Sequence, residues 1–344
     1  MSGYRDRERL ASLWRLELER FEAEHPRSKQ LFDRATEHLP DGVPMLWMAK
    51  WPGPWPVYVA EASGAHFRDV DGTDFVDFCL GDTGAMCGHA PHASVAAIEA
   101  QLERGSTFML PTEDAAIAAE LLADRFGVPL WQFTLSATDA NRALIRYARQ
   151  ATGRPRILVH DHSYHGTVDE AYATLDEHGA VVARRGNIGP PVELTRTTAV
   201  VPFNDVPALE AVLRAGDIAA MLIEPALTNI GIVLPERGYL DAVRELCTRH
   251  GVILIIDETH TLSAGPGGMT GALGLEPDAV VVGKSIGGGI PAGAYGMTEE
   301  LNTRVRASLE LEDIDVGGVG GTLAGNAVSL AGIRATLSEV LTPS

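Results

Sequence analysis

The strongest constraint on the fold is an alternation of short, mainly apolar segments with longer helix-compatible ones. Segments at 131–135, 156–160, 219–223, 252–256 and 279–283 predict strands, and segments at 92–104, 113–126, 138–151, 205–215, 237–250 and 298–309 predict helices. The strands at 219–223 and 252–256 especially are apolar on both faces, as parallel strands covered by helices on each side must be. The sequence therefore predicts an α/β fold with a mostly parallel sheet flanked by helices.

The first 78 residues do not follow this pattern. Residues 5–38 are charged and compatible with helix, and residues 40–56 contain five prolines and three tryptophans. Residues 57–78 alternate around Asp71-Gly72, which predicts a small antiparallel hairpin. We therefore predict an N-terminal arm and small-domain segment at 1–78, a large α/β domain at 79–310 and a final segment at 311–344. The tryptophans line a substrate pocket or cover the small sheet: Trp47, Trp51 and Trp55.

Composition excludes several classes of partner. The formal net charge of −18 opposes binding to nucleic acid and to anionic membranes, which leaves small molecules. No apolar run reaches the ~18 residues that cross a bilayer and residues 1–24 are charged, so we expect a cytoplasmic protein. Three cysteines without C-x-x-C spacing suggest neither a disulfide framework nor a zinc cage. An H-x-H-x-x-H pattern at 160–165 has no supporting carboxylate context, so no metal is predicted.

Two charged residues follow neighbouring predicted strands. Asp257 ends the strand at 252–256, and Lys284 follows the strand at 279–283. A nucleotide-binding P-loop is excluded because Asp278 stands where its first glycine is required. The segment 136–141 follows another strand and opens a helix, where backbone N–H groups bind phosphate. Lysine, aspartate and a phosphate cradle are what pyridoxal phosphate requires, since the amine bonds to its aldehyde and the carboxylate keeps its ring nitrogen protonated.

The motifs resemble those of the class III (ω-type) aminotransferases, which belong to the fold-type I pyridoxal-phosphate superfamily. The similarity is greatest to the branch that contains glutamate-1-semialdehyde aminomutases and β-amino-acid aminotransferases. It is carried by the segments 71–78, 136–141, 164–166, 224–225, 257–258, 283–296 and 321–326, which together span most of the chain. The most specific is the glycine-rich stretch after Lys284, which Asp257 precedes by 27 residues (284 − 257).

The resemblance implies roles for individual residues and a homodimer. Lys284 is then the Schiff-base lysine, Asp257 the partner of the ring nitrogen, and Thr322 a phosphate ligand of the neighbouring subunit. The remaining implied cofactor-binding residues surround the phosphate and the ring: Ser136, Ala137, Thr138, Tyr164, His165, Glu224 and Thr259. The large domain at 79–310 is then the cofactor-binding domain, and the final segment holds the inter-subunit phosphate loop and the start of a linker helix.

Several positions depart from the family pattern. Ala137 replaces a glycine of the phosphate turn, and residues 43–47 offer no arginine for a substrate carboxylate. Relatives continue into a C-terminal subdomain, which we expect to be missing because the sequence ends at Ser344. The sequence thus predicts an aminotransferase that works by ping-pong transfer from an amine donor to a carbonyl acceptor. Two alternatives stay open: an intramolecular 2,1-aminomutase, and a non-catalytic dimer that binds the cofactor.

Overall fold

The computed structural model describes residues 6–190, 192–307 and 318–343. It contains two compact units, one formed by the residues up to Leu80 with Gly88–Ala90, and the other by Gly81–Cys87 with the residues from Pro91 onward. The predicted domain boundary between residues 310 and 311 lies outside the described residues, as does the end of the helix predicted at 298–309.

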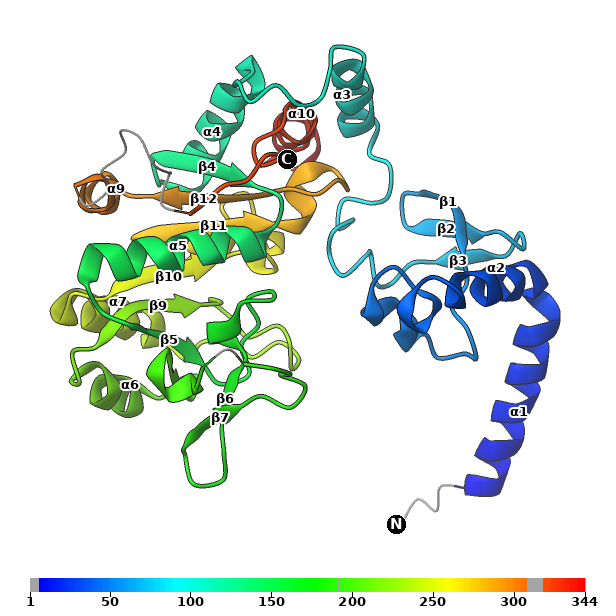
Figure 1. The fold of residues 1–344 in the computed structure, drawn as a ribbon, viewed down its shortest axis with the longest axis horizontal. Coiled ribbons are helices and arrows are strands. Elements are labelled where there is room, and N and C mark those ends of the chain that lie inside the picture. The colour runs from blue at the N-terminus through cyan, green and yellow to red at the C-terminus, as the bar shows by residue number, and fades with distance from the viewer. Residues whose placement is uncertain (1–5, 191, 308–317, 344) are drawn as a thin grey trace. The chain divides into compact units, whose positions relative to one another are not determined.

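The N-terminal unit combines two helices with a small antiparallel sheet (Figure 1). Its elements are α1 (Arg7–Glu24), α2 (Pro26–Thr36), β1 (Val59–Ser63), β2 (His66–Asp69) and β3 (Asp74–Val76). The Asp71-Gly72 turn joins β2 to β3 as predicted, and β1 adds a third strand on the other side of β2. The Asp71 carboxylate accepts hydrogen bonds from the backbone N–H groups of Arg27 and Ser28 at 2.7 and 2.9 Å, which fixes the turn to the first turn of α2.

The larger unit is built on a seven-stranded sheet with the order β4-β12-β11-β10-β9-β5-β8. These strands are β4 (Leu130–Thr134), β5 (Arg156–His160), β8 (Thr198–Val201), β9 (Ile218–Ile223), β10 (Ile253–Asp257), β11 (Ala279–Gly283) and β12 (Gly293–Met297). All neighbouring pairs from β11 to β8 are parallel, and β12 runs antiparallel to both β11 and β4. The prediction of a mostly parallel α/β sheet is confirmed.

Helices cover both faces of this sheet, and Figure 1 shows α5 lying across one of them. The helices of this unit are α3 (His92–Leu102), which packs against α10, and α4 (Glu113–Phe126), α5 (Ala137–Thr152), α6 (Val206–Leu213), α7 (Tyr239–His250), α8 (Gly268–Leu273), α9 (Glu299–Arg306) and α10 (Ala327–Ala335); a two-stranded ribbon adds β6 (Ala173–Leu175) and β7 (Val181–Ala183). Successive residues of β10 alternate between two buried clusters: Ile253 and Ile255 pack with α5, and Leu254 and Ile256 pack with α7. A strand buried on both faces explains the continuous apolar run seen in the sequence.

Strand β12 was not among the predicted strands, because its sequence is rich in glycine, which is depleted in strands. Its glycines permit close approach: a Cβ on Gly293 would lie 2.4 Å from the backbone carbon of Ser136, and one on Gly296 would lie 2.6 Å from the Trp131 ring. Glycine is therefore required here by packing and not by a loop conformation. Among the described residues, no helix combines the length and apolar character needed to cross a membrane.

Candidate active site

The candidate site lies at the carboxyl ends of neighbouring strands, where parallel α/β sheets bind their ligands. Lys284 directly follows β11 and begins a short 3₁₀ turn, Lys284–Gly287. Its φ angle of 51° is left-handed, a conformation that costs a residue with a side chain about 1–2 kcal/mol. The Lys284 ammonium donates to Asp82 Oδ2 at 2.7 Å and also contacts His260 Nε2. Such backbone strain is typical of functional positions, which agrees with the predicted importance of Lys284.

Asp257 ends β10 and is almost completely buried, with 3% of its surface exposed. Its Oδ2 accepts from His165 Nδ1 at 3.0 Å and from Asn141 Nδ2 at 2.9 Å. Its Oδ1 accepts from the Thr259 hydroxyl at 2.6 Å and from the Thr259 N–H at 3.1 Å. Burial alone raises the pKa of Asp257, but these donors, His165 foremost, outweigh burial and hold the pKa below its usual value. The site thus contains a buried anion fixed by four hydrogen bonds.

The predicted phosphate cradle is the first turn of α5. Ser136 caps this helix, because its hydroxyl accepts from the Asp139 N–H at 3.2 Å and donates to the Asp139 carboxylate at 2.8 Å. The Ser136 side chain is therefore engaged in the cap, and the N–H groups of Ala137 and Thr138 are those that the helix geometry leaves for an anion. The extra methyl of Ala137 faces Gly283, where an added Cβ would lie only 2.9 Å away. Glycine at 283 accommodates the alanine at 137.

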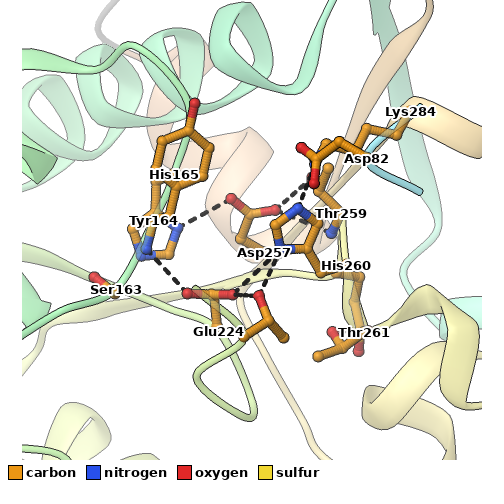
Figure 2. A network of polar contacts seen from close by, with 12 residues as sticks. Asp82, Ser163, Tyr164, His165, Glu224, Asp257, Thr259, His260, Thr261 and Lys284 are labelled. Atoms are coloured by element: carbon orange, nitrogen blue, oxygen red, sulfur yellow. Dashed lines mark hydrogen bonds and ion pairs between the residues drawn. The ribbon is translucent and has the colours of Figure 1, made fainter. Parts of the chain in front are cut away.

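Three further predicted residues connect the strand ends (Figure 2). Glu224 follows β9 with 2% of its surface exposed, and its Oε1 accepts from the Tyr164 N–H at 3.0 Å. Burial raises the pKa of the Tyr164 phenol, which keeps that hydroxyl protonated. The resemblance implied that His165 is a cofactor-binding residue, and the structure places its ring against Asp257.

Sequence reasoning missed several residues of this site, and one of them is Asp82, the ion-pair partner of Lys284. Asn141 was seen as part of the phosphate motif, but its amide also binds Asp257. His260 and Thr228 were not considered: Thr228 Oγ1 lies 2.5 Å from His260 Nδ1 and donates to Glu224 Oε2 at 2.6 Å. His260 adjoins the Asp-Glu-Thr motif at 257–259, and that position was the available signal. No sequence signal marks Thr228.

Other predicted residues lie elsewhere in the described structure. Thr322 is exposed on the wall of a pocket of about 790 Å³ whose lining includes neither Lys284 nor Asp257. Within the N-terminal unit, the rings of Trp51 and Trp55 lie 6.4 and 5.7 Å from the ring of Phe21, and Trp47 is 65% exposed. The role of these tryptophans in substrate binding stays a prediction.

The histidines of the H-x-H-x-x-H pattern have separate environments. The buried His160 Nε2 lies 2.7 Å from the Tyr239 hydroxyl, His162 is near Asp161 at 3.5 Å, and His165 contacts Asp257. No group of three or more histidine, cysteine, aspartate or glutamate side chains in the described part of the chain is arranged to hold a metal ion.

Comparison with known proteins identifies the family. A family model described as aminotransferase class-III matches residues 47–344. This chain belongs to the class-III aminotransferase family. It is 37% identical to a glutamate-1-semialdehyde 2,1-aminomutase of Nitratidesulfovibrio vulgaris over 91% of this chain and 74% of the relative.

Two solved structures are also similar to this class-III aminotransferase chain. A glutamate-1-semialdehyde aminomutase from Pseudomonas aeruginosa aligns with TM-score 0.94 and 49% identity over 98% of this chain and 75% of that one; a variant of it was solved in complex with PMP. An omega-transaminase from Sphaerobacter thermophilus aligns with TM-score 0.83 and 33% identity over 92% of this chain and 73% of that one. The predicted fold type is confirmed, and so is the cofactor, since the family depends on pyridoxal phosphate.

The geometry of this chain fits that cofactor. The buried Asp257 carboxylate supplies the anion that a protonated ring nitrogen requires. The first turn of α5 supplies N–H groups for the phosphate, and Lys284 supplies an amine beside them at the end of β11.

Proposed function

We propose that this chain belongs to an enzyme that moves an amino group between adjacent carbon atoms of one small molecule, as a 2,1-aminomutase does. The observation that carries the proposal is the set formed by Lys284, the buried Asp257 carboxylate and the first turn of α5, which lie at the carboxyl ends of β11, β10 and β4 at one edge of the sheet. The greater identity to proteins described as aminomutases, 49% against 33% for the omega-transaminase, favours an intramolecular shift.

Each residue has a distinct role in this proposal. Bound pyridoxal phosphate supplies an aldehyde that bonds to amines and a ring that accepts the electron pair left on carbon when a proton departs. Asp257 keeps the ring nitrogen protonated, and the N–H groups of Ala137 and Thr138 bind the phosphate. The Lys284 amine takes the proton from the carbon that bears the amino group and returns a proton to its neighbour. Tyr164 would stack on one face of that ring, and Thr259 would pack against the other.

Transamination is the second candidate, and one sequence feature favours it. Residues 43–47, Val-Pro-Met-Leu-Trp, contain no cation that could pair with a substrate carboxylate. An amine donor that lacks this carboxylate, together with a separate carbonyl acceptor, suits the same residues. The two activities differ in one requirement, because only transamination needs a second substrate.

The first experiment tests the residue assignment in the full chain. The protein is incubated with pyridoxal phosphate, reduced with borohydride and mapped by mass spectrometry. The chain has three lysines, Lys29, Lys50 and Lys284, so the position of the adduct is unambiguous. We expect a single adduct on Lys284, unchanged by Lys50→Ala and abolished by Lys284→Ala. An adduct that persists in Lys284→Ala contradicts the assignment.

The second experiment separates the activities. Glutamate-1-semialdehyde is supplied alone, and its isomer with the amino group on the terminal carbon is sought by mass spectrometry. Isomer formation without any keto acid supports the aminomutase. Product that appears only when an amine donor and a keto acid are both present supports transamination. An adduct on Lys284 with neither product supports the non-catalytic dimer.

We also infer a homodimer in which Thr322 reaches the phosphate bound by the partner subunit. Its exposure and its place on the wall of the large pocket support this role. Light scattering measures the mass of the particle directly. We expect a dimer, and we expect the affinity for pyridoxal phosphate to fall in Thr322→Val. A monomer whose affinity is unchanged by Thr322→Val contradicts the inference.

A further inference from the structure

A continuous line of polar contacts leads from Lys284 into the protein. The Lys284 ammonium contacts His260 Nε2, and His260 Nδ1 lies 2.5 Å from Thr228 Oγ1. The Thr228 hydroxyl in turn donates to Glu224 Oε2 at 2.6 Å. Figure 2 shows the His260 ring between Lys284 on one side and Glu224 on the other. We call these four residues the lysine relay.

The order of the strands explains why these side chains meet. Glu224 follows β9, His260 follows β10 by three residues, and Lys284 follows β11. These strands are consecutive neighbours in the sheet, in the order β11-β10-β9. Adjacent parallel strands end side by side, so the three side chains form a row across the carboxyl edge of the sheet.

The number of protons at each atom fixes the direction of the hydrogen bonds. The Thr228 hydroxyl has one proton, which it gives to the Glu224 carboxylate, so it can only accept from His260 Nδ1. Neutral His260 therefore carries its proton on Nδ1 and presents a bare Nε2 to the Lys284 ammonium. Every bond of the relay points from the lysine toward the buried carboxylate.

We propose that His260 is the base that takes a proton from the Lys284 ammonium, with Thr228 and Glu224 as the residues that position it. The step converts an ammonium and a neutral imidazole into a neutral amine and an imidazolium, so net charge is conserved. Glu224 Oε2 lies 3.7 Å from His260 Nδ1 and stabilises the imidazolium. This arrangement of nucleophile, base and orienting acid has the same logic as the triads that activate serine and cysteine.

The inference rests on the proposed function, because the neutral amine is the form that bonds to an aldehyde. The other charged partner of Lys284 is Asp82, whose carboxylate accepts at 2.7 Å and is 78% exposed. Asp82 favours the ammonium, whereas His260, whose side chain is 16% exposed, takes the proton toward the buried Glu224 carboxylate. The two partners thus oppose each other at one nitrogen atom.

The relay is tested on cofactor-free protein by competitive labelling. Trace acetic anhydride acylates neutral amines only, and mass spectrometry compares the rate at Lys284 with the rates at Lys29 and Lys50 in the same molecule. The variants are His260→Gln, which removes the base, and Thr228→Val, which removes the hydroxyl at nearly constant volume. His178→Gln is the matched control, since that side chain is 81% exposed and lies outside the relay.

At neutral pH we expect the relative rate at Lys284 to fall by at least about tenfold in both relay variants, since a positioned base typically contributes about 10²–10⁴-fold. The control keeps the wild-type rate. Circular dichroism establishes that each variant is folded; if His260→Gln does not fold, Thr228→Val decides. An unchanged relative rate at Lys284 in the folded variants overturns the relay, as does an equal fall in His178→Gln.

The failure of this inference is distinguishable from failure of the proposed function. Borohydride trapping of wild-type protein with pyridoxal phosphate reports the function and does not depend on the relay. An adduct on Lys284 together with unchanged labelling in the variants refutes the relay alone. Altered labelling without any adduct in wild-type protein refutes the function and leaves the relay intact.

Discussion

The phosphate cradle can be tested by adding one methyl group. Gly166 has a φ angle of +74°, and a Cβ built on it would lie 2.0 Å from Thr138 Oγ1, 3.1 Å from Thr138 Cβ and 3.3 Å from Thr138 Cα. Thr138 belongs to the first turn of α5, whose N–H groups form the proposed phosphate site. Gly166→Ala therefore pushes on that turn without replacing any residue that is proposed to bind the cofactor.

Three effects set the size of the expected change. A left-handed alanine costs about 1–2 kcal/mol relative to glycine. The Thr138 hydroxyl must rotate away, which abandons the hydrogen bond from the Thr167 N–H at 3.2 Å and costs about 1 kcal/mol. The remaining close contacts with the Thr138 backbone cost about 1–3 kcal/mol, as overpacking does elsewhere. We expect Gly166→Ala to lower the free energy of unfolding by about 3–6 kcal/mol.

Gly153→Ala is the matched control. Gly153 caps the other end of α5 with a φ angle of +67°, and an added Cβ there has no atom within 4 Å. Gly153→Ala should therefore lower the free energy of unfolding only by the cost of a left-handed backbone conformation. Denaturant unfolding of cofactor-free protein measures both variants, and titration with pyridoxal phosphate measures affinity. Only Gly166→Ala should weaken binding, by about tenfold for each 1.4 kcal/mol lost at the phosphate. Equal destabilisation with equal affinity in the two variants refutes the close approach of residue 166 to the cradle.

Three further predictions follow from buried polar groups. In Asp257→Asn the new amide nitrogen must face two hydrogen-bond donors whichever way the amide turns. The free energy of unfolding should therefore fall by about 1–3 kcal/mol in a denaturation experiment. An unchanged value contradicts the four hydrogen bonds to Asp257. Burial lowers the pKa of His160 to about 3 from 6.5, so between these values the unfolded state binds more protons and stability falls with falling pH, by up to about 1.4 kcal/mol per pH unit. Unfolding measured at several pH values should therefore show a shallower slope in His160→Gln, and an identical slope would be evidence against a buried neutral imidazole. Glu224→Gln replaces a charged acceptor of the Tyr164 N–H by a neutral one, so hydrogen exchange at that amide should be about two- to tenfold faster, whereas Thr228→Val should leave it unchanged.

The sequence was informative wherever a residue's role follows from its place along one segment. The apolar runs ending at Asp257 and Gly283 predicted strands, and the rule that ligands bind at carboxyl strand ends then singled out Asp257 and Lys284. The start of α5 was visible because a strand, a serine and a helical pattern follow one another. These are local signals, and the structure places the three features at one edge of the sheet.

Other features depend on which segments meet in space, and the sequence does not state this. Gly293 and Gly296 were not predicted to lie in a strand. Glycine is needed at both positions because a side chain would collide with Ser136 or the Trp131 ring, which are distant in sequence. Ser136 was assigned to the phosphate, but its hydroxyl is used by Asp139 three residues on. That competition between cap and ligand is a local one, and the capping pattern Ser-x-x-Asp could have revealed it.

Glu224 shows how one buried charge can serve two segments at once. Its Oε1 accepts from the Tyr164 N–H on the loop after β5, and its Oε2 accepts from Thr228 in the relay. A carboxylate buried to 2% exposure is costly unless its oxygens are occupied by donors, and both oxygens are. The negative charge therefore holds the loop that carries Tyr164 and also attracts a proton moving from Lys284 toward His260. A neutral side chain of the same size could hold the loop that carries Tyr164, but it could not attract the proton. A carboxylate at position 224 therefore matters to Lys284 as well as to the fold.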